Sequence, residues 1–97
     1  MPTYVSLFKF TDQGIKNVKG TVDRVQQNRA AMEKVGGRLT AAYWTQGAYD
    51  LVAISEWPDE ESAAAFGLHA GMAGNVRTET LRAFDEAAMK RILAKLP

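Results

Sequence analysis

Cysteine is absent from the sequence, and there is a single histidine. Without cysteine, the chain has no disulfides, thiolate metal sites or cysteine nucleophiles. One imidazole cannot supply a histidine cluster for a metal, and we identify no serine–histidine–aspartate triad around it. The sequence therefore excludes the most common metal centres and nucleophilic triads within one chain.

An excess of charge of one sign is also lacking. Twelve basic residues against eleven acidic residues give a net charge of +1, and no Lys/Arg tract is present that would attract nucleic acid or an anionic membrane. No segment approaches the ~20 apolar residues of a membrane span, and the first ten residues do not resemble a signal peptide. We expect a cytoplasmic protein that binds neither nucleic acid nor membrane.

The 97 residues fit one domain, residues 1–97. Runs rich in aromatic and β-branched residues predict strands, and amphipathic or alanine-rich runs between capping residues and glycines predict helices. Two glycines restrict segment 11–20 to a single helical turn. Thr21 and Asp59 are expected to cap the helices that follow them. The predicted strands are 3–10, 38–45, 49–57 and 75–84, and the predicted helices are 22–35, 60–74 and 85–97.

This order of elements predicts an α+β, ferredoxin-like βαββαβ fold with a C-terminal helix. Its antiparallel four-stranded sheet has the order 4-1-3-2, and both crossover helices cover one face. The other face would be bare and partly apolar, which favours a second subunit and a homodimeric α-β barrel. The residues assigned to this bare face are Tyr4, Phe8, Phe10, Thr78, Thr80 and Arg82.

Three stretches of the sequence resemble the GYD-domain family, so that the resemblance spans nearly the whole chain. They are residues 11–20, 43–59 and 74–84, and Gly47, Tyr49 and Asp50 match the Gly-x-Tyr-Asp motif that gives the family its name. The resemblance implies a place among dimeric α-β barrel proteins, which include cofactor-independent monooxygenases, haem enzymes and proteins with no assigned activity. It implies no settled biochemical function for the family itself.

Four side chains are candidates for a ligand site between the two sheets of a dimer: Tyr43, Thr78, Thr80 and Arg82. They would surround a small aromatic or anionic molecule. One alternative is a monooxygenase-like or isomerase enzyme acting on an activated aromatic, in which Arg82 binds an anionic oxygen and Tyr43 handles a proton. Another is a non-catalytic assembly or sensing protein with a filled barrel. Without a ligand, Glu56 is the expected partner of Arg82.

The remaining candidates lie in the second long helix and in the hairpin. His69 is interpreted as a surface or partly packed histidine, with an axial haem ligand as the alternative; no cofactor is predicted. The glycines spaced along the helix at 67, 71 and 74 indicate either close backbone packing or a widened cleft. Gly47 permits the hairpin turn. Asp50 is expected to clamp the hairpin to residues 9–14, with a catalytic base as its alternative role.

Overall fold

The computed structural model describes residues 1–97 and has four strands in one sheet. The elements are β1 (Thr3–Phe10), α1 (Asp12–Lys16), the 3-10 turn η1 (Val18–Gly20), α2 (Thr21–Lys34), β2 (Arg38–Trp44), β3 (Leu51–Glu56), α3 (Glu60–Met72), β4 (Val76–Ala83) and α4 (Glu86–Leu93). Every predicted helix and strand is present. The largest boundary difference is at the C-terminal helix, which ends at residue 93 and not at 97. At the hairpin, residues 49 and 50 belong to the connection and not to β3.

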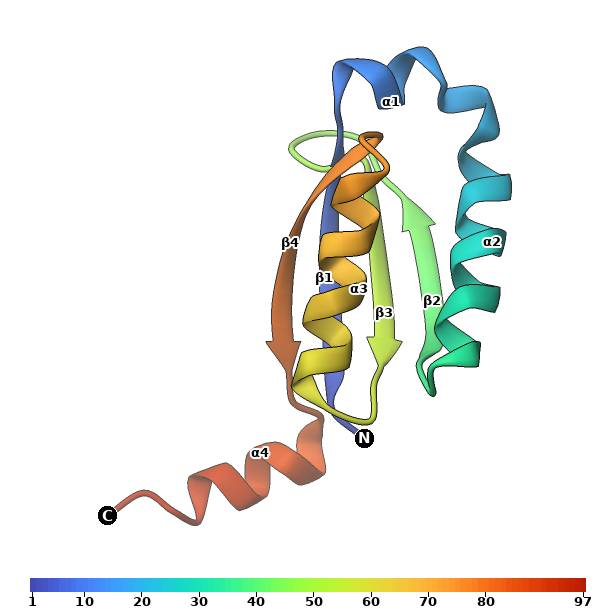
Figure 1. Ribbon diagram of the computed structural model, residues 1–97. Helices are drawn as coiled ribbons and strands as arrows, with labels where there is room; N and C mark the ends of the chain where they lie inside the picture. The colour runs from blue at the N-terminus through green and yellow to red at the C-terminus, as the bar shows by residue number, and fades with distance from the viewer.

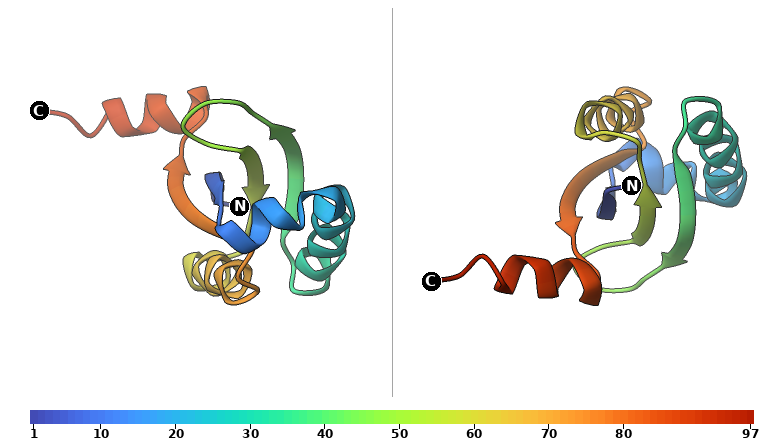
Figure 2. Two further views of the ribbon diagram at one scale, coloured as in Figure 1. Left: turned by 90° about the horizontal axis from the view of Figure 1, so that it is seen from above. Right: turned by 90° about the horizontal axis from the view of Figure 1, so that it is seen from below.

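The sheet has the order β2-β3-β1-β4, and every neighbouring pair of strands is antiparallel. Helix α2 packs against β2 and helix α3 against β4. Figure 2 shows both helices on one side of the curved sheet, with α4 and the β2–β3 connection on the other side. The ferredoxin-like α+β fold predicted from the sequence is therefore confirmed.

Side-chain caps begin three of the helices. Thr11, Asp59 and Asp85 each accept a hydrogen bond from the backbone N–H three residues later, as expected at N-caps. For Asp59, the hydrogen bond from the Ser62 N–H lowers the pKa of the carboxyl group, because it stabilises the carboxylate. The predicted Thr21 cap is wrong: α2 has no side-chain cap, and the Thr21 hydroxyl instead accepts a hydrogen bond from the Trp44 indole, at 3.0 Å.

The assignment of residues to the two sheet faces must be corrected. The set that contains Tyr4, Phe8 and Thr78 does lie on one face, but α2 and α3 cover that face. Alternation along the strands puts a different set on the bare face. These residues, with their neighbours on adjacent strands, are Val5, Leu7, Tyr43, Val52, Ile54, Glu79 and Leu81. Tyr4 joins the buried cluster beneath the helices, and Phe8 and Phe10 line the layer between the helices and the sheet.

The core lies at one end of the helix-covered face. Tyr4, Met32, Trp57 and Ala63 form a buried cluster, and Phe66 is one of the partly buried side chains packed against it. Only nine of the 97 residues are buried. The low number has two structural reasons: one sheet face carries no helices, and the layer between the helices and the sheet contains a cavity.

Helix α4 projects from the body of the protein at the end of β4 (Figure 1). It begins at its Asp85 cap, and its apolar side chains are largely open to solvent, with Met89 45% and Leu93 50% exposed. The predicted amphipathic helix is therefore present, but its apolar stripe is not packed in a core. No helix in the structure is both long enough and apolar enough to span a membrane.

Candidate functional site

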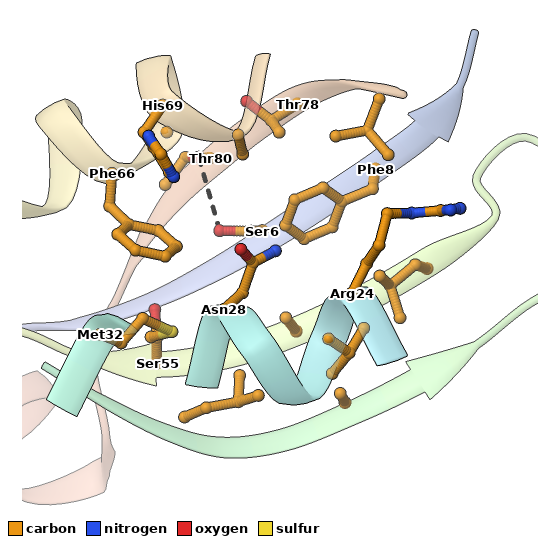
Figure 3. A pocket seen from close by; sticks show the side chains of 18 of the residues that line it. Ser6, Phe8, Arg24, Asn28, Met32, Ser55, Phe66, His69, Thr78 and Thr80 are labelled. Carbon is orange, nitrogen blue, oxygen red and sulfur yellow. Dashed lines mark hydrogen bonds between the residues drawn. The ribbon is translucent and has the colours of Figure 1, made fainter. Parts of the chain in front are cut away.

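A cavity of about 300 Å³ lies between α2, α3 and the covered face of the sheet. We call it the helix-side cavity. Cavities that bind small molecules typically have volumes of about 300–1,000 Å³, so this one is at the lower end of that range. It exists because α2 and α3 pack over opposite edges of the sheet and leave the middle uncovered (Figure 3).

Aromatic side chains form much of the wall of the helix-side cavity. Phe8 comes from β1, and Phe66 from α3 lies between Trp57 and His69. The ring centroids are 5.2 Å apart for Trp57 and Phe66, and 5.6 Å apart for Phe66 and His69. Distances of this size are typical of favourable aromatic pairs. The cavity therefore presents flat apolar surfaces to anything that enters it.

Polar groups are distributed among these rings, and several have no partner within the chain. The Tyr4 hydroxyl and Arg24 Nη2 are buried without a hydrogen bond. Figure 3 shows the Asn28 amide facing Ser6 in the middle of the cavity, with Arg24 beside Phe8 at one end. Buried polar groups are almost always hydrogen-bonded in folded proteins. These two groups therefore have unused hydrogen-bonding capacity, which a ligand or water could satisfy.

The helix-side cavity is lined by positive charge and by no negative charge. Of the residues that line it, only Arg24 carries a permanent charge, and no aspartate or glutamate is present. The net charge of +1 spread over the whole chain gave no sign of this. The local electrostatics of the cavity therefore favour an anion over a cation.

The glycines of α3 border open space. A Cβ atom added at Gly67 or Gly71 would have no other atom within 4 Å, whereas one at Gly74 would approach Gln13. Gly67 lines the helix-side cavity, and both Gly67 and Gly71 line a shallower groove between α3 and β4. Within the chain, close backbone packing is therefore the wrong explanation for Gly67 and Gly71. Both glycines border open space, as a widened cleft requires.

The four predicted ligand residues do not come together. Thr78 and Thr80 line the helix-side cavity, whereas Tyr43 pairs with Val52 on the bare face and is 64% exposed. A site with Tyr43 beside the two threonines is therefore wrong, because Tyr43 lies on the opposite side of the sheet. The enzyme hypothesis that combined Tyr43 with Arg82 fails in that form for the same reason.

Arg82 lies on the helix-covered side of β4 and is exposed. Its guanidinium donates to the backbone carbonyl oxygens of Thr3, at 3.2 Å, and Ala83, and lies 4.5 Å from the centre of the Phe84 ring. The expected pair with Glu56 is wrong, because Glu56 lies opposite Thr3 on the other face. Arg82 thus holds the ends of β1 and β4 together.

The Gly-x-Tyr-Asp segment forms the connection between β2 and β3. Gly47 has a φ of +111°, which glycine adopts readily. The Tyr49 hydroxyl donates to a Glu79 carboxylate oxygen on β4. This bond raises the pKa of Tyr49, because it stabilises the neutral phenol beside a negative charge. Tyr49 thereby ties the connection across the bare face.

Asp50 lies beside the end of β1, as predicted from the strand order. Its Oδ2 atom accepts a hydrogen bond from the Phe10 N–H at 2.8 Å, and its own N–H donates to the Phe8 carbonyl at 2.8 Å. The turn that follows β1 does not supply the donor, because the Thr11 N–H donates to the Asn75 carbonyl. Asp50 bridges β3 and β1 at the backbone.

His69 lies at the mouth of the helix-side cavity and its ring points inward (Figure 3). The alternative haem role does not fit this geometry. A porphyrin is larger than most drug-sized ligands, and a cavity of about 300 Å³ is at the lower end of the range for such ligands. No cluster of three or more His, Asp or Glu side chains is arranged to hold a metal ion.

The helix-side cavity includes two residues that the sequence analysis did not select, Arg24 and Asn28 on α2. A signal for Asn28 was present. Thr21, Val25, Asn28 and Met32 are spaced by four, three and four residues, so they share one helix face. A polar side chain in phase with an inward apolar stripe is the informative exception to burial patterns. The sequence contained no comparable signal for Arg24.

Comparison with known families gives a match for nearly the whole chain. The GYD domain model matches residues 4–93. The chain belongs to the GYD domain family. A Thermus thermophilus protein named "Glutamine synthetase and cystathionine beta-lyase binding protein" is 33% identical to this GYD protein over 88 residues, which cover 90% of this chain and 93% of the relative.

A solved structure also resembles this GYD protein. The crystal structure of TTHA0845 from Thermus thermophilus superimposes with a TM-score of 0.55 and 28% sequence identity. The alignment covers 88% of this chain and 95% of that chain. The family match over residues 4–93 includes the helix-side cavity and the Gly-x-Tyr-Asp connection, so both lie within the GYD domain.

Proposed function

We propose that this GYD protein binds a small organic molecule in the helix-side cavity. The observation that carries the proposal is the cavity itself: about 300 Å³ within a single chain, walled by aromatic rings and supplied with the unpaired hydroxyl of Tyr4 and the unpaired Nη2 of Arg24. Apolar walls with a few convergent polar groups are typical of ligand sites. A pocket inside each subunit replaces the pocket between two sheets that the sequence suggested.

A cavity-filling variant tests this proposal. Gly67→Leu places a side chain in the helix-side cavity without a clash at Cβ, and Gly71→Leu adds the same side chain to the outer groove. Both changes favour the helix equally. Native mass spectrometry should detect a bound small molecule on wild-type protein and on Gly71→Leu, each purified from the protein's own cells. It should be lost from Gly67→Leu. A bound molecule on all three proteins, or on none, would contradict the proposal.

Self-association through the bare face is a second part of the proposed function. Val5, Leu7, Val52 and Ile54 form an apolar strip there, continued by Leu81, which is 46% exposed. Contiguous apolar patches on soluble proteins commonly mark interaction surfaces. A two-fold dimer would bury this strip against its own copy, giving the homodimer expected from the sequence.

Two leucine variants test the dimer. Leu81→Glu places a charge on the bare face, whereas Leu68→Glu places one on the outer side of α3, where Leu68 is 73% exposed. Sedimentation equilibrium at micromolar concentration should show a wild-type dimer, a Leu81→Glu monomer and a Leu68→Glu dimer. A monodisperse wild-type monomer would remove the dimer and leave the cavity proposal intact.

An enzyme-binding role is the second candidate function. The Thermus relative is named for binding glutamine synthetase and cystathionine beta-lyase, and α4 of this chain presents an apolar stripe that makes no core contact. A helix of this kind can dock in a groove of another protein. Leu93→Glu places a charge on the apolar stripe of α4, whereas Ala87→Glu places one on its polar face. Purified glutamine synthetase from the same organism should bind wild type and Ala87→Glu, but not Leu93→Glu. Equal binding by the two variants would exclude α4.

A further inference from the structure

We infer that the ligand of the helix-side cavity is an organic anion with a flat, apolar body, and that Arg24 binds its charged end. The inference rests on the proposed binding role of the cavity. It adds the chemical class of the ligand and names the residue that selects it. The sequence had given this role to Arg82, whose guanidinium is occupied by two backbone carbonyls.

The position of Arg24 is the first argument. Its Nη1 atom donates to the Asn17 carbonyl at 2.9 Å, which fixes the guanidinium at the Phe8 end of the cavity. Its Nη2 atom is buried and has no partner. Its guanidinium therefore keeps hydrogen-bonding capacity that the chain does not use, and a carboxylate or phenolate oxygen is the acceptor that its planar geometry suits best.

The absence of any compensating charge is the second argument. No aspartate or glutamate lines the helix-side cavity, so no group of the protein neutralises Arg24 there. The Asn28 amide lies farther along, in the middle of the cavity (Figure 3), where it can donate to a polar group elsewhere on the ligand. A cationic ligand would face repulsion from Arg24 without any attraction to offset it.

The walls define the rest of the ligand. Phe8 lies near Arg24 at one end of the cavity, and Phe66 lies toward the other end (Figure 3). Trp57 packs against Phe66, with 5.2 Å between the ring centroids. A planar ring between these aromatic walls would place its charged substituent at the Arg24 end. The volume of about 300 Å³ limits the ligand to a compact molecule of one or two rings. Aromatic carboxylates of this size are therefore the appropriate probes.

Calorimetric titration with matched acids and amides tests the inference. The probes are benzoate, cinnamate and 2-naphthoate, each compared with its uncharged carboxamide at pH 7. Wild-type protein should bind at least one acid about tenfold or more tightly than its amide, because the amide keeps a hydrogen bond to arginine but loses the attraction between two opposite charges. Arg24→Gln should remove this preference by weakening the binding of the acid much more than the binding of its amide.

Two further variants serve as controls. Arg24→Lys keeps the positive charge and should retain part of the preference for the acid, which also excludes misfolding as the cause of the loss in Arg24→Gln. Arg29 is on the same helix but does not line the cavity, so Arg29→Gln should behave like the wild type. Circular dichroism of each variant checks that the fold is intact.

The outcomes separate this inference from the proposed function. If acids and amides bind equally and Gly67→Leu blocks both, the cavity binds ligands but the anion preference is refuted. If Arg24→Gln keeps the preference for acids, Arg24 is not the selecting residue and the inference is refuted. If none of the six probes binds, the inference is refuted, and the native mass spectra of the two glycine variants decide the proposed function by themselves. If binding persists in Gly67→Leu, both the inference and the proposed function fail.

Discussion

Replacement of Asp50 by asparagine tests whether the motif aspartate holds the hairpin to β1. The carboxylate accepts one hydrogen bond, from the partly buried Phe10 N–H at 2.8 Å. A hydrogen bond to a charged group contributes about 1.5–3 kcal/mol net, and a neutral one about 0.5–1.5 kcal/mol. Asparagine retains an acceptor, so we expect Asp50→Asn to lower the free energy of unfolding by about 1 kcal/mol.

Alanine at the same position should cost more. Asp50→Ala removes the acceptor altogether and leaves the Phe10 N–H unpaired in a partly buried position, for an expected loss of about 2–3 kcal/mol. For a domain of this size, each kcal/mol corresponds to about 4–8 °C in the melting temperature. The backbone bonds of Asp50 to Phe8 and Thr45 are unaffected by either change.

Urea unfolding followed by tryptophan fluorescence measures both effects. Protein concentration is held constant, because self-association would make the apparent stability depend on it. Asp23→Asn is the matched control, since Asp23 is exposed in the first turn of α2 and makes no side-chain hydrogen bond in the structure. Wild-type stability in both Asp50 variants would refute the clamp. If Asp50→Asn also lost probe binding, Asp50 would instead be a functional residue.

Three other measurements test separate parts of the structure. Gly67→Ala and Gly71→Ala should each raise the free energy of unfolding by about 0.4–1 kcal/mol, because the added methyl group meets no atom within 4 Å; a loss of stability would show that a second molecule packs there. Gly14→Ala should prevent normal folding, because its Cβ would lie 1.9 Å from a backbone oxygen of the α3–β4 connection, and a soluble variant with a wild-type melting temperature would contradict that contact. Glu79→Gln should lower the pKa of Tyr49 in an ultraviolet absorbance titration, because the bond to Glu79 raises it; an unchanged titration would show that the bond does not form in solution. The stability from this bond is fully present below pH ~10 and is lost as the pH rises through the raised pKa.

The sequence predicted the fold because its local signals agree with one another. Strand residues alternate or cluster, Asp59 caps α3, and glycines end α2. The strand order then placed Asp50 beside Phe10, and the structure confirms that contact. These predictions succeed because they depend on periodicity and topology, and both can be read along the chain.

The sequence did not determine which face of the sheet the helices cover, because two assignments of the strand residues fitted equally well. Both alternate sets of β1 are apolar, with Tyr4 and Phe8 in one set and Val5 and Leu7 in the other, so the pattern could not show which set meets the helices. The wrong choice moved the whole predicted site to the wrong side of the sheet, since a shift of one residue exchanges the faces. The role of Arg24 depends on the arrangement of side chains in three dimensions, which the sequence pattern does not reveal.

The central claim is that the helix-side cavity, and not the bare face, binds the ligand. A nuclear magnetic resonance titration of sodium cinnamate into ¹⁵N-labelled protein tests it directly. We predict that the Trp57 indole signal and the backbone signals of Asn28 and His69 shift together and saturate, while the signals of Val52 and Ile54 stay in place. Shifts confined to Val52 and Ile54, or no saturable shift at all, would contradict the claim.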